Sequence, residues 1–268
     1  MNQKDFIRDF DFKFKKKYGQ NFLTDDNILN NIVSFSRVDK DTLVIEIGCG
    51  AGALTRKLVK YAKNVIGYEI DETLKPILNT IDGVDIIFCD FLKRNVKNDI
   101  SKYEYKKLFV IANLPYYITT PIITKIIEDK LGVDKIIIMV QKEVGDRLSA
   151  EPNSKDYNSL TLFIKYYFEV KKLFVVSKNV FIPKPNVDSI VISLEKTSQK
   201  YEVNDEELFF KLVRDSFVQK RKTLRNNLKG YNFNIIENVL RENGFSSDVR
   251  AEALPIEIFI EISNRLSN

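Results

Sequence analysis

Short apolar runs rich in β-branched residues recur along the first two-thirds of the chain. Such runs predict buried strands, and we expect them in order at 42–47, 64–70, 84–89, 108–112 and 135–141. Between them, apolar residues recur at helical spacing over 53–61, 72–78 and 120–128. This alternation predicts an α/β fold with a mostly parallel sheet and helices on both faces. Two more runs, 167–176 and 187–195, lack a convincing helix between them and predict an antiparallel edge pair.

The hydrophobic pattern changes after residue 195. Residues 197–204 are polar and resemble a linker, and the apolar positions of 205–219, 234–242 and 255–266 then follow a helical period. We therefore expect two domains, an α/β domain over 1–196 and a small C-terminal all-helical domain over 197–268.

Composition narrows the chemistry more than it narrows the fold. The 268 residues include no histidine and two cysteines, Cys49 and Cys89. We therefore expect no metal site, and no Ser-His-Asp or Cys-His machinery. Apolar runs are strand-sized and the N-terminus lacks a signal-peptide pattern, so we expect a cytoplasmic protein without a membrane segment. The net charge of +5 is weak evidence for a nucleic-acid partner.

The first predicted strand ends in a glycine-rich turn, Glu46–Gly52, that leads into a predicted helix. Glycines such as Gly48 and Gly50 let the backbone approach a ligand closely, although a purely structural turn is the alternative. Glu69 ends the second strand 21 residues after Gly48, where nucleotide-binding folds place a carboxylate on ribose hydroxyls. The acidic residue Glu46 suits a cationic, amino-acid-bearing cofactor, which points to S-adenosylmethionine over NAD.

The third and fourth strands also end in polar side chains. Asp90 could accept a hydrogen bond from an adenine amino group, or it could only cap a turn. The fourth strand runs into Asn113-Leu114-Pro115-Tyr116. The Asn113 amide oxygen and the Leu114 carbonyl could accept the two N–H bonds of adenine N6, and Tyr116 could stack on the base. No strong base is needed, because the amine loses its proton after methyl transfer.

Phe181 is a second aromatic candidate for contacting the target base. It opens the segment Phe181–Val187, in which two prolines favour an extended loop. The ring could cover the other face of a base flipped into the site. The alternative is an ordinary aromatic residue buried beneath a loop.

The chain resembles the ribosomal RNA adenine dimethyltransferases, above all the small-subunit dimethyladenosine transferases of the kasugamycin-resistance family. The resemblance rests on the glycine and Asn113 motifs together with segments spread along the chain, at 17–23, 141–144, 154–157, 181–189, 220–228 and 250–254. It implies a Rossmann-like S-adenosylmethionine methyltransferase fold. It also implies two methyl groups on each of two adjacent adenosines in the 3′-terminal hairpin of 16S-type RNA, in a small-subunit particle of the pre-30S type.

The resemblance assigns roles that spacing alone does not give. Asn21 and Leu23 would line the methionine end of the cofactor pocket, and Gly48 would contact its amino-acid portion. Glu69 would hold the ribose and Asp90 the adenine, while Asn113 would lie between the cofactor and the target base. Cys49, beside the glycines, departs from the family pattern and could make the pocket sensitive to thiol reagents.

Basic residues gather in two places. Lys220, Arg221, Lys222, Arg225 and Lys229 form the denser cluster, and on a helix most of them would share one face. We interpret this cluster as binding RNA phosphates. We interpret the N-terminal lysines, Lys13 and Lys15–Lys17, as a solvated face.

Three alternatives remain open. A large-subunit adenine methyltransferase would share the fold and chemistry, but it favours isoleucine at the position of Leu114. A DNA adenine methyltransferase would need a target-recognition domain, for which little chain remains. A binding module without turnover is disfavoured by intact Gly48, Glu69 and Asn113. We expect a monomer.

Overall fold

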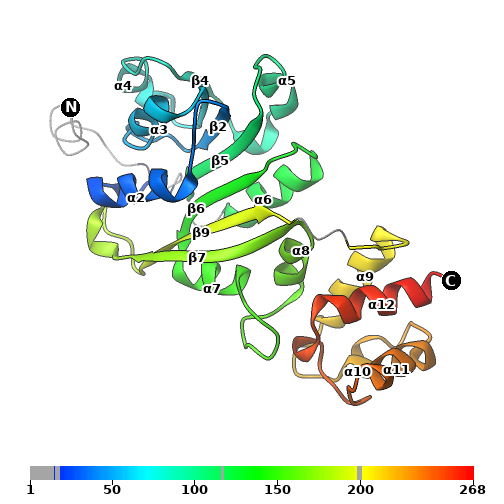
Figure 1. Cartoon of the computed structure of the whole chain (residues 1–268). Helices are drawn as coiled ribbons and strands as arrows, with labels where there is room; N and C mark the ends of the chain where they lie inside the picture. Colours follow the sequence, from blue (N-terminus) through cyan, green and yellow to red (C-terminus); the bar gives the residue numbers. More distant parts are fainter. Residues whose placement is uncertain (1–14, 16–18, 116–117, 198–200) are drawn as a thin grey trace. The chain divides into compact units, whose positions relative to one another are not determined.

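The computed structural model describes all residues except 1–14, 16–18, 116–117 and 198–200 (Figure 1). The chain forms two compact units. The first runs to Gly145 and includes Lys171–Lys196, and the second comprises Asp146–Val170 and Thr197–Asn268. The predicted boundary at 196/197 coincides with one of these breaks, but the sequence did not separate Asp146–Val170 from the first domain.

A seven-stranded sheet forms the centre of the first unit, in the order β4-β3-β2-β5-β6-β9-β7. Its strands are β2 (Thr42–Ile47), β3 (Asn64–Glu69), β4 (Asp85–Phe88), β5 (Lys107–Asn113), β6 (Lys135–Gln141), β7 (Phe168–Val176) and β9 (Ser189–Lys196). From β4 to β6 every neighbouring pair is parallel, whereas β9 runs antiparallel to β6. The predicted mostly parallel sheet is confirmed.

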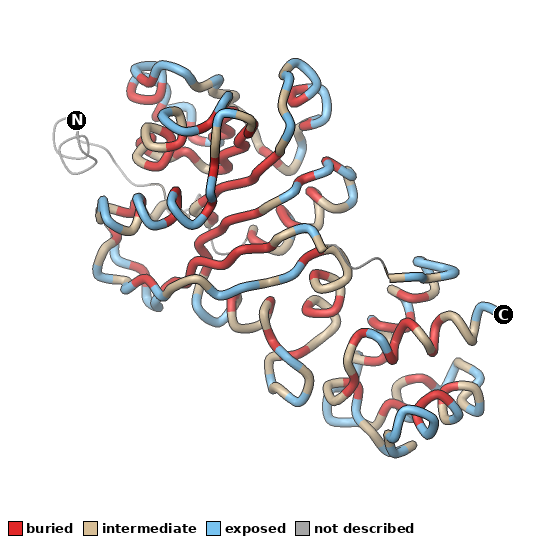
Figure 2. The backbone as a smooth tube through the Cα atoms, viewed as in Figure 1, coloured by how far each residue is buried: buried red, intermediate tan, exposed pale blue. Residues whose placement is uncertain are grey.

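The central strands are buried on both faces. All six residues of β2 are buried, as are the five inner residues of both β5 and β6 (Figure 2). Apolar side chains on both faces of a strand are what a parallel sheet between two helical layers requires. Parallel strands bring their carboxyl ends to one edge, so the residues that follow β2, β3 and β5 come together there.

Helices connect these strands. The α-helices of this part are α2 (Asp26–Ser36), α3 (Thr55–Tyr61), α4 (Lys75–Leu78), α5 (Val96–Ile100), α6 (Thr119–Glu128) and α7 (Lys142–Leu148). Among the described residues of this part, short 3₁₀ turns accompany them at Glu72–Leu74, Phe91–Lys93 and Lys178–Val180. Helix α2 begins where the Asp25 carboxylate accepts hydrogen bonds from the amides of Asn27 and Ile28.

A small second sheet closes one side of the first unit. It pairs β1 (Phe22–Leu23) with β8 (Phe181–Ile182) in antiparallel register, so that Leu23 lies opposite Phe181. Leu23 and Phe181 both belong to the core that β2, β5 and β6 share with α2 and α3. The segment that precedes α2 is thereby paired with a segment about 160 residues later in the chain.

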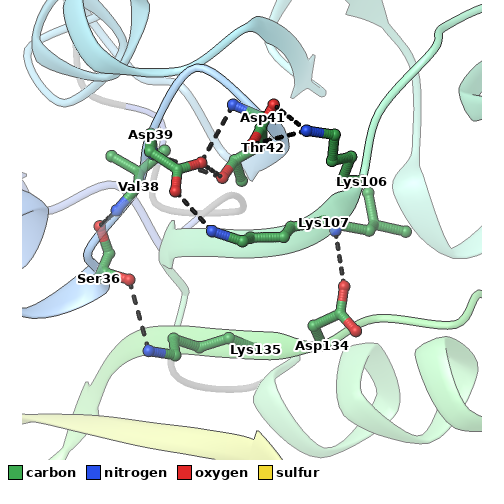
Figure 3. A network of polar contacts seen from close by, with 10 residues as sticks. Ser36, Val38, Asp39, Asp41, Thr42, Lys106, Lys107, Asp134 and Lys135 are labelled. Atoms are coloured by element: carbon green, nitrogen blue, oxygen red, sulfur yellow. Dashed lines mark hydrogen bonds and ion pairs between the residues drawn. The ribbon is translucent and has the colours of Figure 1, made fainter.

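The amino ends of the central strands, opposite the carboxyl ends just described, carry a polar network (Figure 3). Asp39 accepts hydrogen bonds from Lys107 Nζ at 2.5 Å and from Thr42 Oγ1 at 2.7 Å. These bonds lower the pKa of Asp39 to about 2. The Asp134 carboxylate accepts from the Leu108 amide at 2.9 Å. These contacts tie together the first residues of β2 and β5 and the residue that precedes β6.

The second unit is helical in its C-terminal part. Its helices are α8 (Ser159–Tyr167), α9 (Glu206–Ser216), α10 (Leu224–Asn227), α11 (Phe233–Glu242) and α12 (Ile256–Leu266), with a 3₁₀ turn at Ala251–Ala253. Their buried faces share one core, to which α8 contributes Leu162 and the preceding loop contributes Tyr157. The Tyr157 hydroxyl donates to the Leu254 carbonyl at 2.9 Å. These contacts explain why Asp146–Val170 groups with the C-terminal helices.

In the part of the chain that the structure describes, no helix is both long and apolar enough to cross a membrane.

Candidate active site

A cavity of about 290 Å³ opens at the carboxyl ends of β2, β3 and β5, within the first unit. Its walls come from the turns that follow these strands and from the segment that precedes α2. The lining includes Gly19–Leu23, Glu46–Gly50, Tyr68–Ile70, Cys89–Leu92 and Asn113–Pro115. Eight of the residues predicted to act on cofactor or base are among them: Asn21, Leu23, Gly48, Gly50, Glu69, Asp90, Asn113 and Leu114.

The glycine turn after β2 needs its glycines for conformation and for space. Gly48, Gly50 and Gly52 have φ values of 76°, 54° and 78°, in the left-handed region that disfavours other residues. A Cβ on Gly52 would lie 2.3 Å from Ile81 Cδ1. The turn therefore presents bare backbone to the cavity at Gly48 and Gly50.

Glu69 bridges the two turns that form this wall. One carboxylate oxygen accepts from the Gly50 amide at 2.8 Å, and the other accepts from the Asp71 amide at 2.8 Å. Burial raises the pKa of Glu69 despite these bonds. Each carboxylate oxygen has a second lone pair, so both can still accept from a ligand hydroxyl.

Glu46, the penultimate residue of β2, is the most unusual group in the cavity wall. Its side chain is 1% exposed, and among the described residues its Oε2 has no hydrogen-bond partner. Burial raises the pKa of Glu46 to about 8, and the Glu69 carboxylate acts in the same direction. A buried carboxyl oxygen without a hydrogen-bond partner costs free energy, and a cationic donor on a bound ligand would recover it.

Asp90 forms the turn cap considered from its sequence position, and it lies in the cavity wall, where the adenine contact stays a prediction. Its Oδ1 accepts from the Leu92 amide at 3.0 Å and so caps the short helix Phe91–Lys93, while the residue also lines the cavity. Behind it, the Tyr68 hydroxyl donates to Asp99 at 2.9 Å, and Arg94 pairs with that carboxylate at 2.7 Å.

Asn113 and Leu114 lie where β5 ends. The Asn113 amide nitrogen donates to the Asn21 carbonyl at 3.3 Å, and the Leu114 amide donates to the Met139 carbonyl at 3.3 Å. In the described part of the chain, no hydrogen bond reaches Asn113 Oδ1 or the Leu114 carbonyl oxygen. The cavity therefore has two neighbouring acceptors available at this corner.

Two aromatic residues, Tyr116 and Phe181, were predicted to contact the target base. Tyr116 lies outside the described residues. Phe181 does not line the cavity: it is 3% exposed and packs in the core beneath α2, opposite Leu23. The structure therefore matches the alternative of a buried loop aromatic, because pairing of β1 with β8 turns the ring into the core.

The family model for ribosomal RNA adenine dimethylases matches residues 11–268. The chain belongs to this family. The ribosomal RNA small subunit methyltransferase A of Bacillus cytotoxicus is 47% identical to it, over 98% of this chain and 94% of that protein. The family consists of S-adenosylmethionine-dependent methyltransferases, so the predicted enzyme class and cofactor are confirmed.

Solved structures show the same fold. A dimethyladenosine transferase from Plasmodium falciparum is 25% identical, with a TM-score of 0.74 over 90% of this chain and 95% of that one. The 23S rRNA methyltransferase ErmE is 23% identical, with a TM-score of 0.72 over 92% of this chain and 100% of that one. The predicted Rossmann-like methyltransferase fold with a helical C-terminal part is confirmed.

Cys49 is packed into this dimethylase's cavity wall. It is buried against the Tyr68 carbonyl, and burial raises the pKa of its thiol. A buried thiol with a raised pKa is a poor nucleophile. The predicted sensitivity to thiol reagents therefore depends on how far such a reagent can enter the cavity.

Three polar residues of the dimethylase cavity region were missed from the sequence. Lys15, Gln20 and Asp71 meet beside the cavity, where the Asp71 carboxylate accepts from both other side chains. The predicted solvated face is therefore wrong for Lys15, whereas Lys13, Lys16 and Lys17 lie outside the described residues. The sequence offered one signal, a second acidic residue two positions after Glu69. Its partners Lys15 and Gln20 lie more than 50 residues earlier in the chain, so the sequence did not reveal them.

The basic segment, 220–229, belongs to the second unit. The predicted single helix face is wrong, because residues 217–222 form turns and helix α10 begins only after Thr223. Thr223 caps α10, and the Asn227 side chain fastens the turns: its amide nitrogen donates to the Ser216 carbonyl at 2.8 Å, and its Oδ1 accepts from the Gln219 amide at 3.0 Å. These local bonds compete with a continuous helix.

The cations of the basic segment differ in their partners. All of them are exposed: Lys220, Arg221, Lys222, Arg225 and Lys229. Arg225 pairs with Glu237 at 3.1 Å and lies 4.4 Å from the centre of the Phe233 ring. Lys220 donates to the Lys155 carbonyl. Arg221 and Lys222 have no side-chain partner in the described part of the chain.

Proposed function

We propose that this chain dimethylates N6 of two adjacent adenosines in the 3′-terminal hairpin of 16S-type small-subunit ribosomal RNA, during assembly of the small subunit. The observation that carries the proposal is the pair of unpaired acceptors, Asn113 Oδ1 and the Leu114 carbonyl, at the corner of the cavity. The choice of the small subunit is supported by the name of the Bacillus cytotoxicus relative and the long coverage of the match.

The residues around the cavity fit S-adenosylmethionine. Glu46 offers the unpaired Oε2 of a buried carboxyl to the cofactor's ammonium group, and Glu69 offers lone pairs to its ribose hydroxyls. The bare backbone at Gly48 and Gly50 permits close approach of the amino-acid portion, next to Asn21 and Leu23. Asp90, on the neighbouring turn, offers a carboxylate to the adenine amino group. The bound cofactor supplies a methyl group on a sulfonium centre.

Asn113 and Leu114 activate the target amine by geometry. The lone pair of adenine N6 is delocalised into the ring. Acceptance of both N–H bonds by Asn113 Oδ1 and the Leu114 carbonyl favours a pyramidal nitrogen with its lone pair directed at the methyl group. The Asn21 carbonyl fixes the amide of Asn113 so that its oxygen remains free. Because N6 loses its proton after attack, a chain without histidine can perform the step.

We assign RNA binding to the basic segment. Lys220, Arg221, Lys222 and Arg225 are exposed cations on short, locally fastened turns. Such a group gives affinity through phosphates but little sequence information. Choice of the two adenosines is therefore left to the cavity and to the shape of the RNA.

The deciding experiment measures methyl transfer from labelled S-adenosylmethionine to undermethylated small subunits. Wild type should place label in N6,N6-dimethyladenosine, and Asn113→Ala should reduce the rate by about 100-fold or more, as for loss of one oxyanion-type contact. Asn30→Ala is the matched control, since Asn30 is exposed on α2 and, within the described residues, its side chain bonds Lys57 alone.

Large subunits serve as the competing substrate in the same assay. Label in large-subunit RNA and none in small-subunit RNA would replace the proposal by the alternative that ErmE represents. Cofactor binding without transfer to either particle would indicate a binding protein.

The proposal includes a cytoplasmic, monomeric protein. A light-scattering mass near 31.2 kDa for the free chain would support the monomer, and twice that mass would refute it.

A further inference from the structure

Asp71 follows β3 directly and is as buried as any core residue, with a side chain 1% exposed. Its Oδ1 accepts from Lys15 Nζ at 2.6 Å and from the Thr73 hydroxyl at 2.6 Å, and its Oδ2 accepts from Gln20 Nε2 at 2.7 Å. Burial alone would raise the pKa of Asp71, but these bonds outweigh it and hold the pKa below its ordinary value. A charged carboxylate is therefore built into this position.

Two of these donors come from one distant segment, residues 15–20. Gln20 is held at both ends of its amide, because its Oε1 accepts from the Lys15 backbone amide at 2.8 Å while its nitrogen donates to Asp71. Gly19, Gln20 and Asn21 then form one wall of the cavity. Asp71 is thus the anchor of that wall.

Hydrogen bonds connect Asp71 and the wall that it holds to Asn113 and to Glu69. On one side, the Asn21 carbonyl accepts from the Asn113 amide. On the other, the Asp71 amide donates to Glu69, whose second oxygen accepts from Gly50. The Asp71 side chain therefore supports the segment whose Asn21 carbonyl holds Asn113, while the Asp71 backbone amide contacts the group that would hold the ribose.

We propose that Asp71 is a positioning residue for methyl transfer: its carboxylate holds Lys15 and Gln20, which keeps Gly19–Asn21 in the cavity wall, and through Asn21 it orients Asn113. This inference rests on the proposed function of Asn113 and Glu69. It assigns to the ion pair of Lys15 with Asp71 a role in both cofactor retention and the chemical step.

The test separates cofactor binding from chemistry. S-adenosylhomocysteine binding is measured by calorimetry, and the methyl-transfer rate is measured in a single turnover at saturating cofactor on small subunits. Asp71→Ala should weaken binding about tenfold and slow the saturated turnover about tenfold, because both the wall and the Asn113 anchor are lost. A structural role alone would lower the amount of folded protein and leave the saturated rate per folded molecule unchanged.

A donor–acceptor exchange tests the contact itself. Gln20→Glu alone places two carboxylates together and should behave like Asp71→Ala. In the double variant, Gln20→Glu with Asp71→Asn, an amide again faces a carboxylate beside Lys15, and most of both losses should be recovered.

Asp39→Asn is the control for loss of an ion-paired carboxylate. Asp39 pairs with Lys107 and Thr42 at the amino ends of β5 and β2, away from the turns that line the cavity. It should destabilise the chain while the saturated turnover stays within about twofold of wild type. The inference is overturned if Asp71→Ala turns over at the wild-type saturated rate, or if the folded double variant recovers neither binding nor rate. Failure of wild type to methylate small subunits would instead refute the proposed function.

Discussion

Charged groups in the cavity wall and in the basic segment are held in opposite ways. Glu46 and Glu69 in the wall and Asp71 beside it are almost fully buried, and the carboxylates of Glu69 and Asp71 are fixed by amide and ammonium donors. In the basic segment, Arg221 and Lys222 stand in solvent on turns that one asparagine fastens. The buried carboxylates fix the positions of the residues around the cavity, whereas the exposed cations of the basic segment supply positive charge at the surface.

The difference determines how each region should respond to change. A buried group interacts through a low effective dielectric and has no room to relax, so single substitutions there have large effects that depend little on salt. Exposed cations are screened within about 10 Å at ordinary ionic strength, so their effects should be moderate and strongly salt-dependent. The following predictions test this contrast, from the largest expected effect to the smallest.

Glycine-to-alanine substitutions should give the largest difference in stability between the glycine turn and the basic segment. Gly52→Ala would force a left-handed residue and place its Cβ 2.3 Å from Ile81 Cδ1, so we expect a loss of roughly 3 kcal/mol in the free energy of unfolding. Gly230→Ala, at the end of the basic segment, meets no atom within 4 Å and should change stability by less than about 0.5 kcal/mol. Urea denaturation measures both, and equal losses would contradict the contrast.

Glu46→Gln should make the cofactor-free protein more stable than wild type, and this difference should grow as pH rises. With its pKa raised to about 8 in the folded state, Glu46 stays protonated while the unfolded chain ionises. Wild type is therefore fully stabilised by this group only below pH 4.5, its ordinary value, and loses that contribution toward pH 8. The advantage of Glu46→Gln should grow by on the order of 1 kcal/mol per pH unit across this window.

Denaturation of both proteins at several pH values checks this prediction. A constant difference between them would show that Glu46 is ionised in the free protein. The same substitution should weaken binding of S-adenosylhomocysteine, because glutamine offers its ammonium no charge.

Replacing Lys220, Arg221 and Lys222 together by alanine should weaken RNA binding about 10- to 100-fold at low salt. The plot of log affinity against log salt should also become shallower by about 2, since roughly 0.7 to 0.9 counterions are released per phosphate contact. Filter binding to the 3′-terminal hairpin over a salt series measures both quantities. Cofactor affinity is the control and should not change.

Arg225→Ala should have the smallest effect on RNA binding. Arg225 already pairs with Glu237 and stacks near Phe233, so less of its charge is available to a phosphate. We expect a loss of affinity below about threefold, as for a surface ion pair that is exchanged for another contact. A loss as large as that of the triple variant would make Arg225 the principal phosphate contact.

The sequence predicted the sheet and the location of the site well. Strands β2 and β6 have the predicted bounds, because uninterrupted β-branched runs allow few other structures. Glu46, Glu69 and Asn113 lie in the last two positions of parallel strands and Asp90 lies two residues after one, so topology alone brings them to one edge.

Long-range pairing and local competition explain what the sequence did not predict. The burial of Phe181 depends on its pairing with Leu23, and the role of Asp71 depends on Lys15, 56 positions away. Nothing near either residue reveals these partners. At 221–229, helical spacing fitted the basic residues, but Thr223 and Asn227 form local caps that end the helix.

The division of the chain has a practical consequence for making fragments. Because Asp146–Val170 belongs to the helical unit, a fragment cut after residue 196 would retain α8 and lose its partners α9 and α12. Leu162 and Tyr157 would then face water, and such a fragment should aggregate even with its sheet complete. During synthesis, likewise, α8 leaves the ribosome before the helices that cover it, so the last third of the chain must emerge before the second unit can close.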